Sequence, residues 1–523
     1  MSTTNQSYYS VGNNNENNKR IAKNTLLLYV RQLVILVVSL YTVRAALKAL
    51  GAEDYGLFDL VAGTVTVLSF VSGTLTSATQ RFFSFELGQK TQERLKSIFS
   101  VNMVLYVGIA LLLLLALETI GLWFVHHRLT IPPARFDAVV ANFHLAVFSF
   151  FFMVLRTPFN AIMIAHEDMH LFAGISIVEA LLKLGSVIIL QYFITTDKLI
   201  LYGGLLCLVS LFTAIAYITL CGIKYAECQY RKFYWDTKIA RHLLSFTGWT
   251  LFGQISTVFR TQAITIIVNQ YFSPVVLASQ SIAKNISGAV NSFSTNFNTS
   301  LYPPIIKYYA SGEHSQMHSL VYSGSKICFF LLWILALPLM LEMQSVLALW
   351  LGSIPPLLVL FANLSIIEAL LHALSLPLTT AARAPGRMRT YELSLGIVQI
   401  LIFVATLIAF HFGAAAYSMY VVSIIANALL FVLRLYIVQN LIGLSMSQFL
   451  KYVVSPCLVV VFCSASPSIA LKSLLPTGPL YTILIILCSF LINGICIYFL
   501  GLDKQWRLRV RQLLIQKAKK VMP

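Results

Sequence analysis

Positively charged side chains lie inside the long apolar runs of this chain, and they are the residues best placed to do chemistry. An Arg or Lys at the centre of a membrane helix costs roughly 2.5–3.5 kcal/mol on insertion scales, so it usually faces a water-filled cavity or a partner. Guanidinium and ammonium groups bind phosphate oxygens, so a cluster of them favours an anionic ligand over a cationic one. The residues concerned are Arg31, Arg44, Arg156, Lys183, Arg260 and Lys284.

Arg31 lies deep in the first apolar run, which covers about residues 24–47. At 100° per residue on a helix, Asn24, Arg31 and Thr42 fall within about 20° of one another. We expect Arg31 to face an aqueous cavity, and the alternative is a buried structural ion pair. Arg44 is close to the end of the run, so it either faces the same cavity or snorkels to the membrane surface.

The seventh and eighth predicted helices carry polar residues at three- and four-residue spacing along one face. In the seventh helix, Gln254 lies on this stripe and Arg260 on its flank, and in the eighth, Lys284 and Asn291 lie on the stripe. Ser and Thr alone at such positions are typical of close helix packing. Amides together with cations favour a water-filled lumen. We therefore predict a cationic substrate-binding lumen formed by Arg31, Arg260, Lys284, Gln254 and Asn291.

Other ionisable residues in the apolar runs allow alternatives. Glu368 has His372 one helical turn later, which predicts a proton or sodium coupling site or, equally, a paired structural carboxylate. Glu179 precedes Lys183 by four residues, the spacing of a helical ion pair, and this pair is favoured over a lumen-facing lysine. Arg156 is near the inner end of its run, where it meets either a phosphate of the inner leaflet or a helix carbonyl.

The composition identifies the fold class that must position these side chains. Hydrophobic residues make up 58% of the 523 residues and charged residues only 11%, whereas soluble proteins carry about 25% charged residues. The apolar runs do not alternate as barrel strands do, so the spans are helical. We predict an all-α polytopic membrane protein with about 14 transmembrane helices of ~20 residues or more. Their approximate limits are 24–47, 57–79, 97–124, 138–164, 171–194, 199–222, 246–271, 277–302, 321–343, 353–379, 393–412, 415–438, 449–471 and 479–501.

The net charge of +18 is attributed to membrane orientation and not to nucleic-acid binding. Cytoplasmic loops of membrane proteins carry an excess of Lys and Arg. If the N-terminus is cytoplasmic, nearly all loop cations fall on the same side, which predicts that both termini are cytoplasmic. The opposite loops then hold only Lys48, Arg128, Arg135, Lys198 and Lys472.

The longest polar stretch, Lys224–Arg241, is interpreted as a linker between two predicted six-helix lobes. A weak internal repeat, in which Thr25 matches Thr247 and Gln32 matches Gln254, supports two lobes related by an axis along the membrane normal. The predicted organisation is a disordered cytoplasmic tail (1–23), an N-terminal six-helix lobe (24–223), a cytoplasmic basic linker (224–245), a C-terminal six-helix lobe (246–440), two extra transmembrane helices (441–502) and a basic amphipathic cytoplasmic tail (503–523).

Motifs of enzymes are missing from the sequence. There is no GxxxxGK[ST] loop for nucleotide binding, no HExxH or GxSxG motif and no zinc-ligand spacing. The eight cysteines lie mostly in apolar runs and form no CxxC pair, so they are interpreted as small buried hydrophobic residues. We predict a protein that is not an enzyme and that has no cofactor and no metal site.

Four stretches resemble the polysaccharide-exporter branch of the multidrug/oligosaccharidyl-lipid/polysaccharide (MOP) transporter superfamily, the Wzx-like O-antigen and capsule flippases. The turn at Leu50–Gly56 and the segment Gln80–Gly88 carry the more specific part of the resemblance. Beyond about residue 270 the resemblance is architectural only. The stretches are KRIAKNTLLLYVRQL (19–33), ALGAEDYGLFDLV (49–61), TQRFFSFELGQ (79–89) and AHEDMHLFAGISIVEALLKL (165–184).

The resemblance implies a MATE-like bundle in the bacterial inner membrane that opens alternately to each side. Such proteins move undecaprenyl-diphosphate-linked oligosaccharides for lipopolysaccharide O-antigen or capsule synthesis. Similar flippases have cationic lumens with arginines on the first, seventh and eighth helices, here Arg31, Arg260 and Lys284. The implied partners are the lipid-linked glycan, membrane lipids and the glycan polymerase and glycosyltransferases of the same pathway, with no nucleic acid.

The sequence leaves two competing functions. A cation-coupled MATE-type multidrug exporter of the same superfamily fits a positive interior poorly. A membrane-embedded glycan polymerase or ligase tends to need a large external loop, and the longest outside loop predicted here, 126–137, is short.

Overall fold

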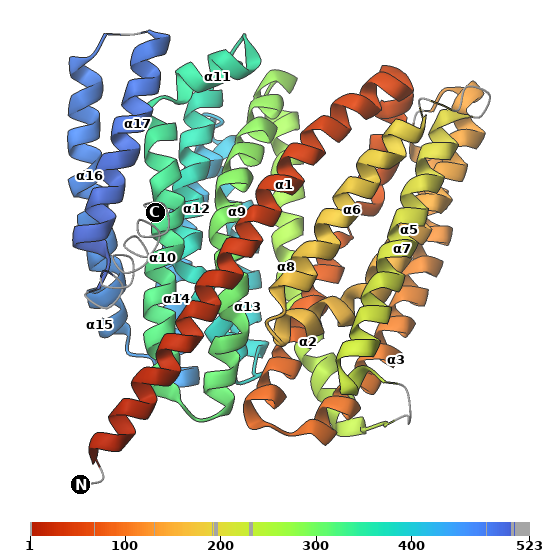
Figure 1. The fold of residues 1–523 in the computed structure, drawn as a ribbon. Coiled ribbons are helices and arrows are strands. Elements are labelled where there is room, and N and C mark those ends of the chain that lie inside the picture. The colour runs from red at the N-terminus through yellow and green to blue at the C-terminus, as the bar shows by residue number, and fades with distance from the viewer. Residues whose placement is uncertain are drawn as a thin grey trace, which may run out of the picture. The chain divides into compact units, whose positions relative to one another are not determined.

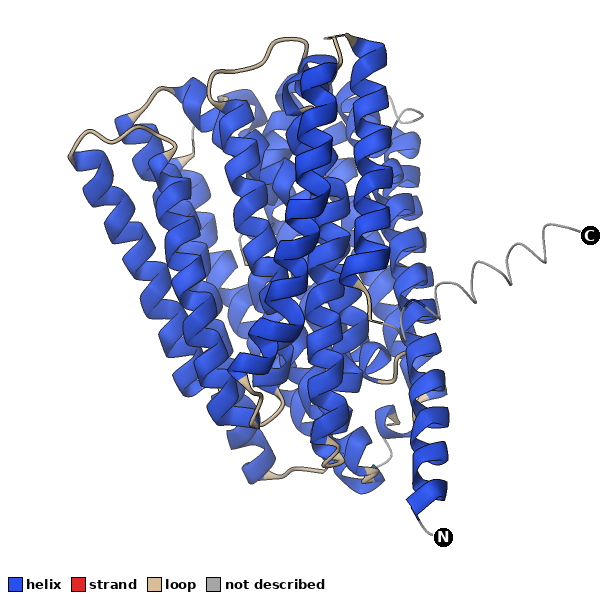
Figure 2. Cartoon of the chain, turned by 90° about the vertical axis from the view of Figure 1, so that its left-hand side faces the viewer, coloured by secondary structure: helices blue, strands red, loops and turns tan. Residues whose placement is uncertain are grey.

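The described part of the chain is entirely helical. The computed structural model describes residues 3–66, 68–129, 131–190, 192, 197–229, 234–476, 478–503 and 507, without the side chains of 3–19, 52, 64, 66 and 92. Within these residues helices are joined by short loops and there is no strand (Figure 2). The all-α class predicted from the sequence is confirmed.

Twelve helical segments in the described ranges are long and apolar enough to cross a membrane. They account for all the predicted spans except 57–79 and 277–302. The described residues of these two segments are also helical, apart from Leu68 between α1 and α2, but the segments are more polar than the other spans. The chain is therefore a multi-pass membrane protein, and the predicted count of about 14 helices is approximate.

The chain separates into two compact units, which are described one at a time. Unit 1 comprises Met1–Gln254 and Ile306–Gly312, and unit 2 comprises Ile255–Ile305 and Glu313–Pro523. The long helices α8 and α9 each contribute residues to both units. The lobe boundaries expected from the sequence stay a prediction.

Unit 1 contains seven complete helices of the described chain, together with the first part of α8. A π-helical turn at Leu117–Gly121 joins α3 to α4, so these form one continuous rod. Short 3-10 turns lie at Pro133–Arg135 and Ala226–Cys228. The helices are α1 (Thr3–Thr66), α2 (Ser69–Gln89), α3 (Gln92–Ala116), α4 (Leu122–Arg128), α5 (Phe136–Ala165), α6 (Met169–Leu190), α7 (Lys198–Lys224) and α8 (Thr237–Tyr271).

Unit 2 contains most of α9 and the helices that follow it. π-Helical turns at Leu450–Val454 and Ile497–Gly501 continue α15 into α16 and extend α17. The helices are α9 (Pro274–Ala310), α10 (His314–Leu341), α11 (Met343–Leu351), α12 (Leu358–Arg383), α13 (Arg389–His411), α14 (Ser418–Ile442), α15 (Met446–Phe449), α16 (Ser455–Leu474) and α17 (Pro479–Cys496).

The first helix differs from the sequence prediction at both of its ends. It begins at Thr3, so the backbone of the tail expected to be disordered is helical from that residue. Adding residues to an existing helix is far easier than starting one, which explains the extension of the first span into the polar tail. Of the predicted amphipathic tail 503–523, residues 504–506 and 508–523 lie outside the described residues.

The sequence predicts a helix end at Leu50–Gly51 followed by a short polar turn at 53–56, but in the structure Gly51 only bends α1. Its φ of 83° and ψ of 168° are outside the helical range, and glycine adopts them without a steric penalty. The helix resumes directly and continues to Thr66, so the expected polar turn at 53–56 is helical instead. The bend is packed in place because Ala46 and Leu50 before it, and Phe58 after it, contact a cluster that includes Tyr202 of α7.

Helices α1, α5, α6 and α7 lie side by side in unit 1 (Figure 1). The surrounding lipid is as apolar as their side chains, so close packing holds such helices together more than exclusion of water does. The buried contact of Leu28 on α1 with Ile164 and Met169 is one example. Helices α5 and α7 approach each other even more closely. A Cβ on Gly203 of α7 would lie 2.2 Å from Oδ1 of Asn142 on α5, which is shorter than any normal contact.

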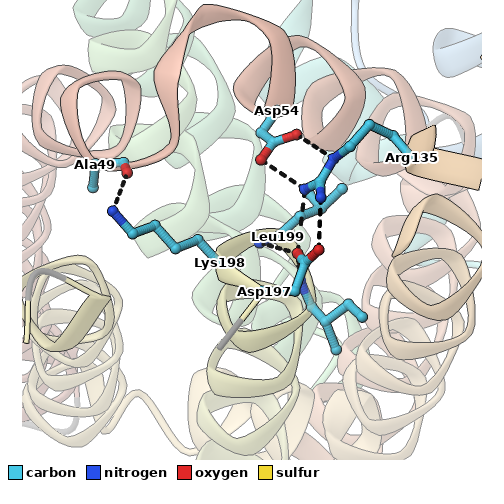
Figure 3. Close-up of polar contacts among 7 residues, drawn as sticks. Ala49, Asp54, Arg135, Asp197, Lys198 and Leu199 are labelled. Atoms are coloured by element: carbon cyan, nitrogen blue, oxygen red, sulfur yellow. Dashed lines mark hydrogen bonds and ion pairs between the residues drawn. The ribbon is translucent and has the colours of Figure 1, made fainter. Parts of the chain in front are cut away.

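One end of these helices is held by Arg135, which lies directly before α5 (Figure 3). Its guanidinium donates to both carboxylate oxygens of Asp54 on α1, at 2.8 and 2.7 Å, and to both of Asp197, at 3.2 and 2.6 Å. Asp197 also caps α7 by accepting from the backbone N–H groups of Leu199 and Ile200. Burial disfavours the charged Asp197 carboxylate, but the hydrogen bond from Arg135 outweighs it, so the pKa of Asp197 is lowered.

The opposite end is held by the turn between α5 and α6. Glu167 is buried, with its side chain 2% exposed, and pairs with Arg20 of α1 and Lys307 of α9, each at 2.7 Å. Asp168 pairs with Lys224 at 2.9 Å and accepts a hydrogen bond from the Tyr225 hydroxyl, just beyond α7. Ion pairs thus tie α1 to the ends of α5, α6 and α7, which fixes the space between the four helices.

We expect Gly203→Ala to destabilise the protein by about 1–3 kcal/mol, because the added methyl group overpacks the contact with α5. The control is Gly204→Ala, since a Cβ at Gly204 would meet nothing within 4 Å. Thermal unfolding of the two purified variants in detergent measures the difference. Equal melting temperatures would contradict the close α5–α7 contact.

The contacts of Asp168 should make the stability of the folded protein depend on pH. Burial opposes its ionisation, but the hydrogen bonds from Lys224 and Tyr225 outweigh burial, and the pKa of Asp168 falls below its ordinary value of 3.8. Because the folded-state pKa is the lower one, the stabilisation is complete at neutral pH and is lost as pH falls through the folded value.

Asp168→Asn should therefore cost about 1.5–3 kcal/mol at pH 7, the size of a hydrogen bond to a charged group. The gap between wild type and variant should close only below about pH 4. Glu53→Gln, at an exposed side chain, is the control. Melting curves from pH 3 to 8 are the measurement, and a gap that does not change with pH would exclude this origin.

Candidate functional site

Unit 1 contains a cavity of about 410 Å³ between α1, α5, α6 and α7. This volume is within the range of small-ligand pockets in proteins. The lining combines aliphatic and aromatic side chains with hydroxyl, amide and charged groups. The lining residues are Arg31, Ile35, Val38, Ser39, Thr42, Val43, Arg156, Asn160, Phe172, Ser176, Glu179, Ala180, Lys183 and Tyr217.

Three of the charged groups in the cavity form one network. Nη1 of Arg156 on α5 donates to Oε2 of Glu179 on α6 at 2.8 Å, and its Nη2 is 3.4 Å from Oε1. Nζ of Lys183 donates to the same Oε1 at 2.8 Å, and Nη1 of Arg156 also donates to the hydroxyl of Thr213 at 2.8 Å. The helical pair predicted between Glu179 and Lys183 is confirmed, and Arg156 shares its carboxylate. The phosphate and helix-carbonyl alternatives for Arg156 are replaced by this ion pair.

Arg31 stands apart from this network. Its guanidinium carbon lies 4.4 Å from the ring centre of Phe172, a cation–π contact. Its Nε is buried without a hydrogen-bond partner, and among the described residues no carboxylate pairs with it. The expectation of a cavity-facing Arg31 agrees with its position, and Ser39 and Thr42 line the cavity from the same helix. Arg44 is exposed and is not part of the lining.

The formal charge of the cavity lining is positive. Arg31, Arg156 and Lys183 are opposed by the single carboxylate of Glu179, which leaves a net charge of +2. Two guanidinium groups can each present parallel N–H donors to phosphate oxygens. The arrangement is therefore suited to a dianionic group, and it repels an organic cation.

Unit 2 contains a second group of charged residues around a smaller cavity of about 50 Å³. Nη1 of Arg260 on α8 is 3.3 Å from Oε1 of Glu368 on α12, and Asn427 donates to the same oxygen at 3.0 Å. Nζ of Lys284 on α9 donates to the hydroxyl of Thr265 at 3.0 Å. Arg260, Lys284 and Glu368 all line this cavity.

The remaining predicted residues are placed as follows. His372 is exposed, and within the described chain no hydrogen bond joins it to Glu368. Gln254 is half-buried in the part of α8 that belongs to unit 1, and Asn291 is half-buried on α9 in unit 2. Neither lines the two cavities described above. The single lumen of Arg31, Arg260, Lys284, Gln254 and Asn291, and ion coupling through Glu368 and His372, stay predictions.

Sequence reasoning did not assign Arg156, Glu179 and Lys183 to the site. The spacing of Glu179 and Lys183 indicated that they pair, but it gave no sign of a third partner. Arg156 is 23 positions before Glu179 and on another helix, so only the packing of α5 against α6 brings them together.

Comparison with known proteins identifies the architecture. No protein-family model and no curated protein matches the chain. The fold is similar to that of an outward-facing multidrug resistance MATE family transporter of the MOP superfamily, with a TM-score of 0.71 over 82% of this chain and 97% of that chain at 14% identity. The MATE transporter ClbM in complex with Rb⁺ gives a TM-score of 0.64 at 15% identity, over 82% and 96% of the chains.

A third similar structure is a MOP superfamily transporter from Pyrococcus furiosus, with a TM-score of 0.68 over 80% of this chain and 96% of that chain at 12% identity. Its description states that a reversed polarity of the binding pocket suggests a different function. These likenesses define the fold of the present chain as that of MATE and MOP transporters.

Glu368 either neutralises Arg260 as a structural ion pair or binds a coupling ion, and the two roles have different consequences when it is replaced. Glu368→Gln should destabilise the protein by about 3–5 kcal/mol, because it leaves the partly buried Arg260 without its counter-charge. The double variant with Arg260→Gln should recover a large part of this loss.

Thermal unfolding of both variants and wild type provides the measurement. If Glu368→Gln keeps wild-type stability but removes the response of transport to an imposed proton or sodium gradient, the carboxylate couples an ion instead.

Proposed function

We propose that this protein is a flippase of the bacterial inner membrane, with both termini cytoplasmic, that translocates polyprenyl-diphosphate-linked oligosaccharides by alternating access. The glycan serves lipopolysaccharide O-antigen or capsule synthesis. The diphosphate enters the cavity of unit 1, and the polyprenyl tail remains in the bilayer. The observation that carries the proposal is the net charge of +2 on the lining, to which Arg31 contributes without a carboxylate partner.

The other lining groups support a glycan attached to this diphosphate. Each of the four helices supplies hydroxyl or amide groups to the lining, namely Ser39, Thr42, Asn160, Ser176 and Tyr217. Hydroxyl and amide groups match the hydrogen-bonding groups of sugars. Phe172 and the aliphatic residues of α1 supply the apolar part of the lining.

The competing function is export of organic cations, which is favoured by the likeness of the fold to a multidrug resistance MATE family transporter. The lining argues against it, because a cation would lie beside Arg31, Arg156 and Lys183 with only Glu179 to attract it. A like charge at such short range is repelled strongly in a site partly shielded from water. The two functions therefore predict opposite ligand charges.

The test is transfer of a fluorescent undecaprenyl-diphosphate-oligosaccharide between the leaflets of proteoliposomes. Wild type should accelerate transfer, and Arg31→Ala should reduce the rate at least about 10-fold, because it removes charged hydrogen bonds worth about 1.5–3 kcal/mol. Arg44→Ala is the matched control, since Arg44 lies on the same helix and is exposed. It should keep the wild-type rate.

Two results would contradict the proposal. Transfer by wild type that is no faster than in protein-free vesicles, with an ion gradient imposed, would remove the flippase. Efflux of organic cations by the same preparation would replace it with the drug exporter. Normal transfer by Arg31→Ala would keep the flippase but reject the cavity of unit 1 as its site.

A further inference from the structure

Glu179 accepts hydrogen bonds from the same N–H groups of Arg156 and Lys183 that would bind a phosphate. Both of its carboxylate oxygens are taken: Oε2 by Nη1 of Arg156 and Oε1 by Nζ of Lys183, each at 2.8 Å. The side chain is 17% exposed and lies in the cavity wall. The Nη1 and Nη2 groups of Arg156 face this carboxylate, so a phosphate can bind them only by replacing it.

The two cations that pair with Glu179 are attached to it in different ways. Lys183 is one helical turn further along α6, so its ion pair moves with the helix that carries Glu179. Arg156 reaches Glu179 from α5, and Thr213 of α7 offers its guanidinium a second contact. Arg156 can therefore exchange partners while Lys183 keeps Glu179 neutralised.

We infer that Glu179 is a positioning and selectivity residue of the anion site, an internal counter-ion that the substrate replaces at Arg156. This inference rests on the proposed function. In the exchange, Arg156 transfers its donors from the carboxylate to an oxygen of the diphosphate, Arg31 binds a further oxygen, and Glu179 stays paired with Lys183. No covalent bond changes.

The charge of the lining defines which substrate completes the exchange. A diphosphate that links a lipid to a sugar carries two negative charges at neutral pH, equal and opposite to the net +2 of the cavity. A monophosphate diester carries one and leaves Arg31 or Arg156 uncompensated. Every anion must displace the Glu179 carboxylate from Arg156, so Glu179 lowers the affinity of the site for all anions. Only a dianion neutralises the lining completely, and it therefore compensates best for the lost ion pair.

Replacement of an internal counter-ion has a consequence for turnover. A transporter must release its substrate, so a site with three unopposed cations would bind the diphosphate too tightly. Return of Glu179 to Arg156 assists release, because it satisfies the guanidinium as the phosphate leaves. Glu179 therefore weakens binding and speeds release, which separates its role from that of a purely structural ion pair.

The experiment uses two water-soluble probes, a geranyl-diphospho-disaccharide and the matching geranyl-phospho-disaccharide. Isothermal titration calorimetry of the detergent-purified full chain measures their binding, and leaflet transfer in proteoliposomes measures turnover. Wild type should bind the diphosphate at least about 10-fold more tightly than the monophosphate.

Glu179→Gln should bind the diphosphate about 10-fold more tightly than wild type and the monophosphate by a larger factor, so that the preference for the diphosphate narrows. It should also transfer the lipid-linked glycan more slowly at saturating substrate. Glu179→Asp keeps the charge on a shorter side chain, so its affinity should lie between the two, and it should restore part of the turnover. Adding Arg156→Gln to Glu179→Gln should abolish the gain in affinity. Lys183→Gln should not reproduce the gain, because it leaves the Glu179–Arg156 pair in place.

The outcomes separate this inference from the proposed function. If wild type binds and transfers the glycan but Glu179→Gln binds it equally or more weakly, the carboxylate is structural and the exchange is wrong. If Glu179→Gln does not fold, Glu179→Asp decides in the same way, since affinity at or below that of wild type rejects the exchange. If wild type binds neither probe, the proposed function fails and the inference fails with it.

Discussion

The structure depends on how charge is accommodated inside an apolar membrane. A charged side chain in a spanning helix needs a partner or a polar cavity, and most of the cations in these helices have a partner. Arg156 and Lys183 share Glu179 in unit 1, and Arg260 pairs with Glu368 in unit 2. Arg31 is different, since among the described residues it contacts an aromatic ring and no carboxylate. The surplus positive charge in unit 1 follows from this imbalance.

The ion pairs at the two ends of α5 explain how the cavity keeps its shape. Arg135 joins the start of α5 to α1 and α7, and the turn at 167–168 joins the end of α5 to the same helices. The carboxylates of Asp54 and Asp197 each accept two hydrogen bonds from Arg135, which determines the orientation of the groups as well as their distance. Side chains that line a site are most effective when the elements that carry them are held in place before the ligand binds. The helices around Arg31 meet this requirement.

The sequence predicted the all-α membrane class, the position of nearly every span and the cavity-facing Arg31, because these follow from apolar runs and helical periodicity. The partners of Arg156 and Arg260 were not predictable in this way. Glu179 and Glu368 are 23 and 108 positions away on other helices, and periodicity carries no information about pairing between helices. The bend at Gly51 was predicted as a helix end, since a glycine before a polar segment indicates a break. Contacts of Ala46, Leu50 and Phe58 with residues of α6 and α7 hold the bend in place, and the local sequence carries no signal of them.

The central claim is that a diphosphate binds among the cations of unit 1. A cryo-electron microscopy structure of the full chain with a geranyl-diphospho-disaccharide tests it most directly. The account predicts density for two phosphates in the cavity between α1, α5, α6 and α7, with Arg31 and Arg156 in contact with their oxygens. Density for the diphosphate elsewhere, with Arg31 uncontacted and Arg156 still paired with Glu179, would contradict it.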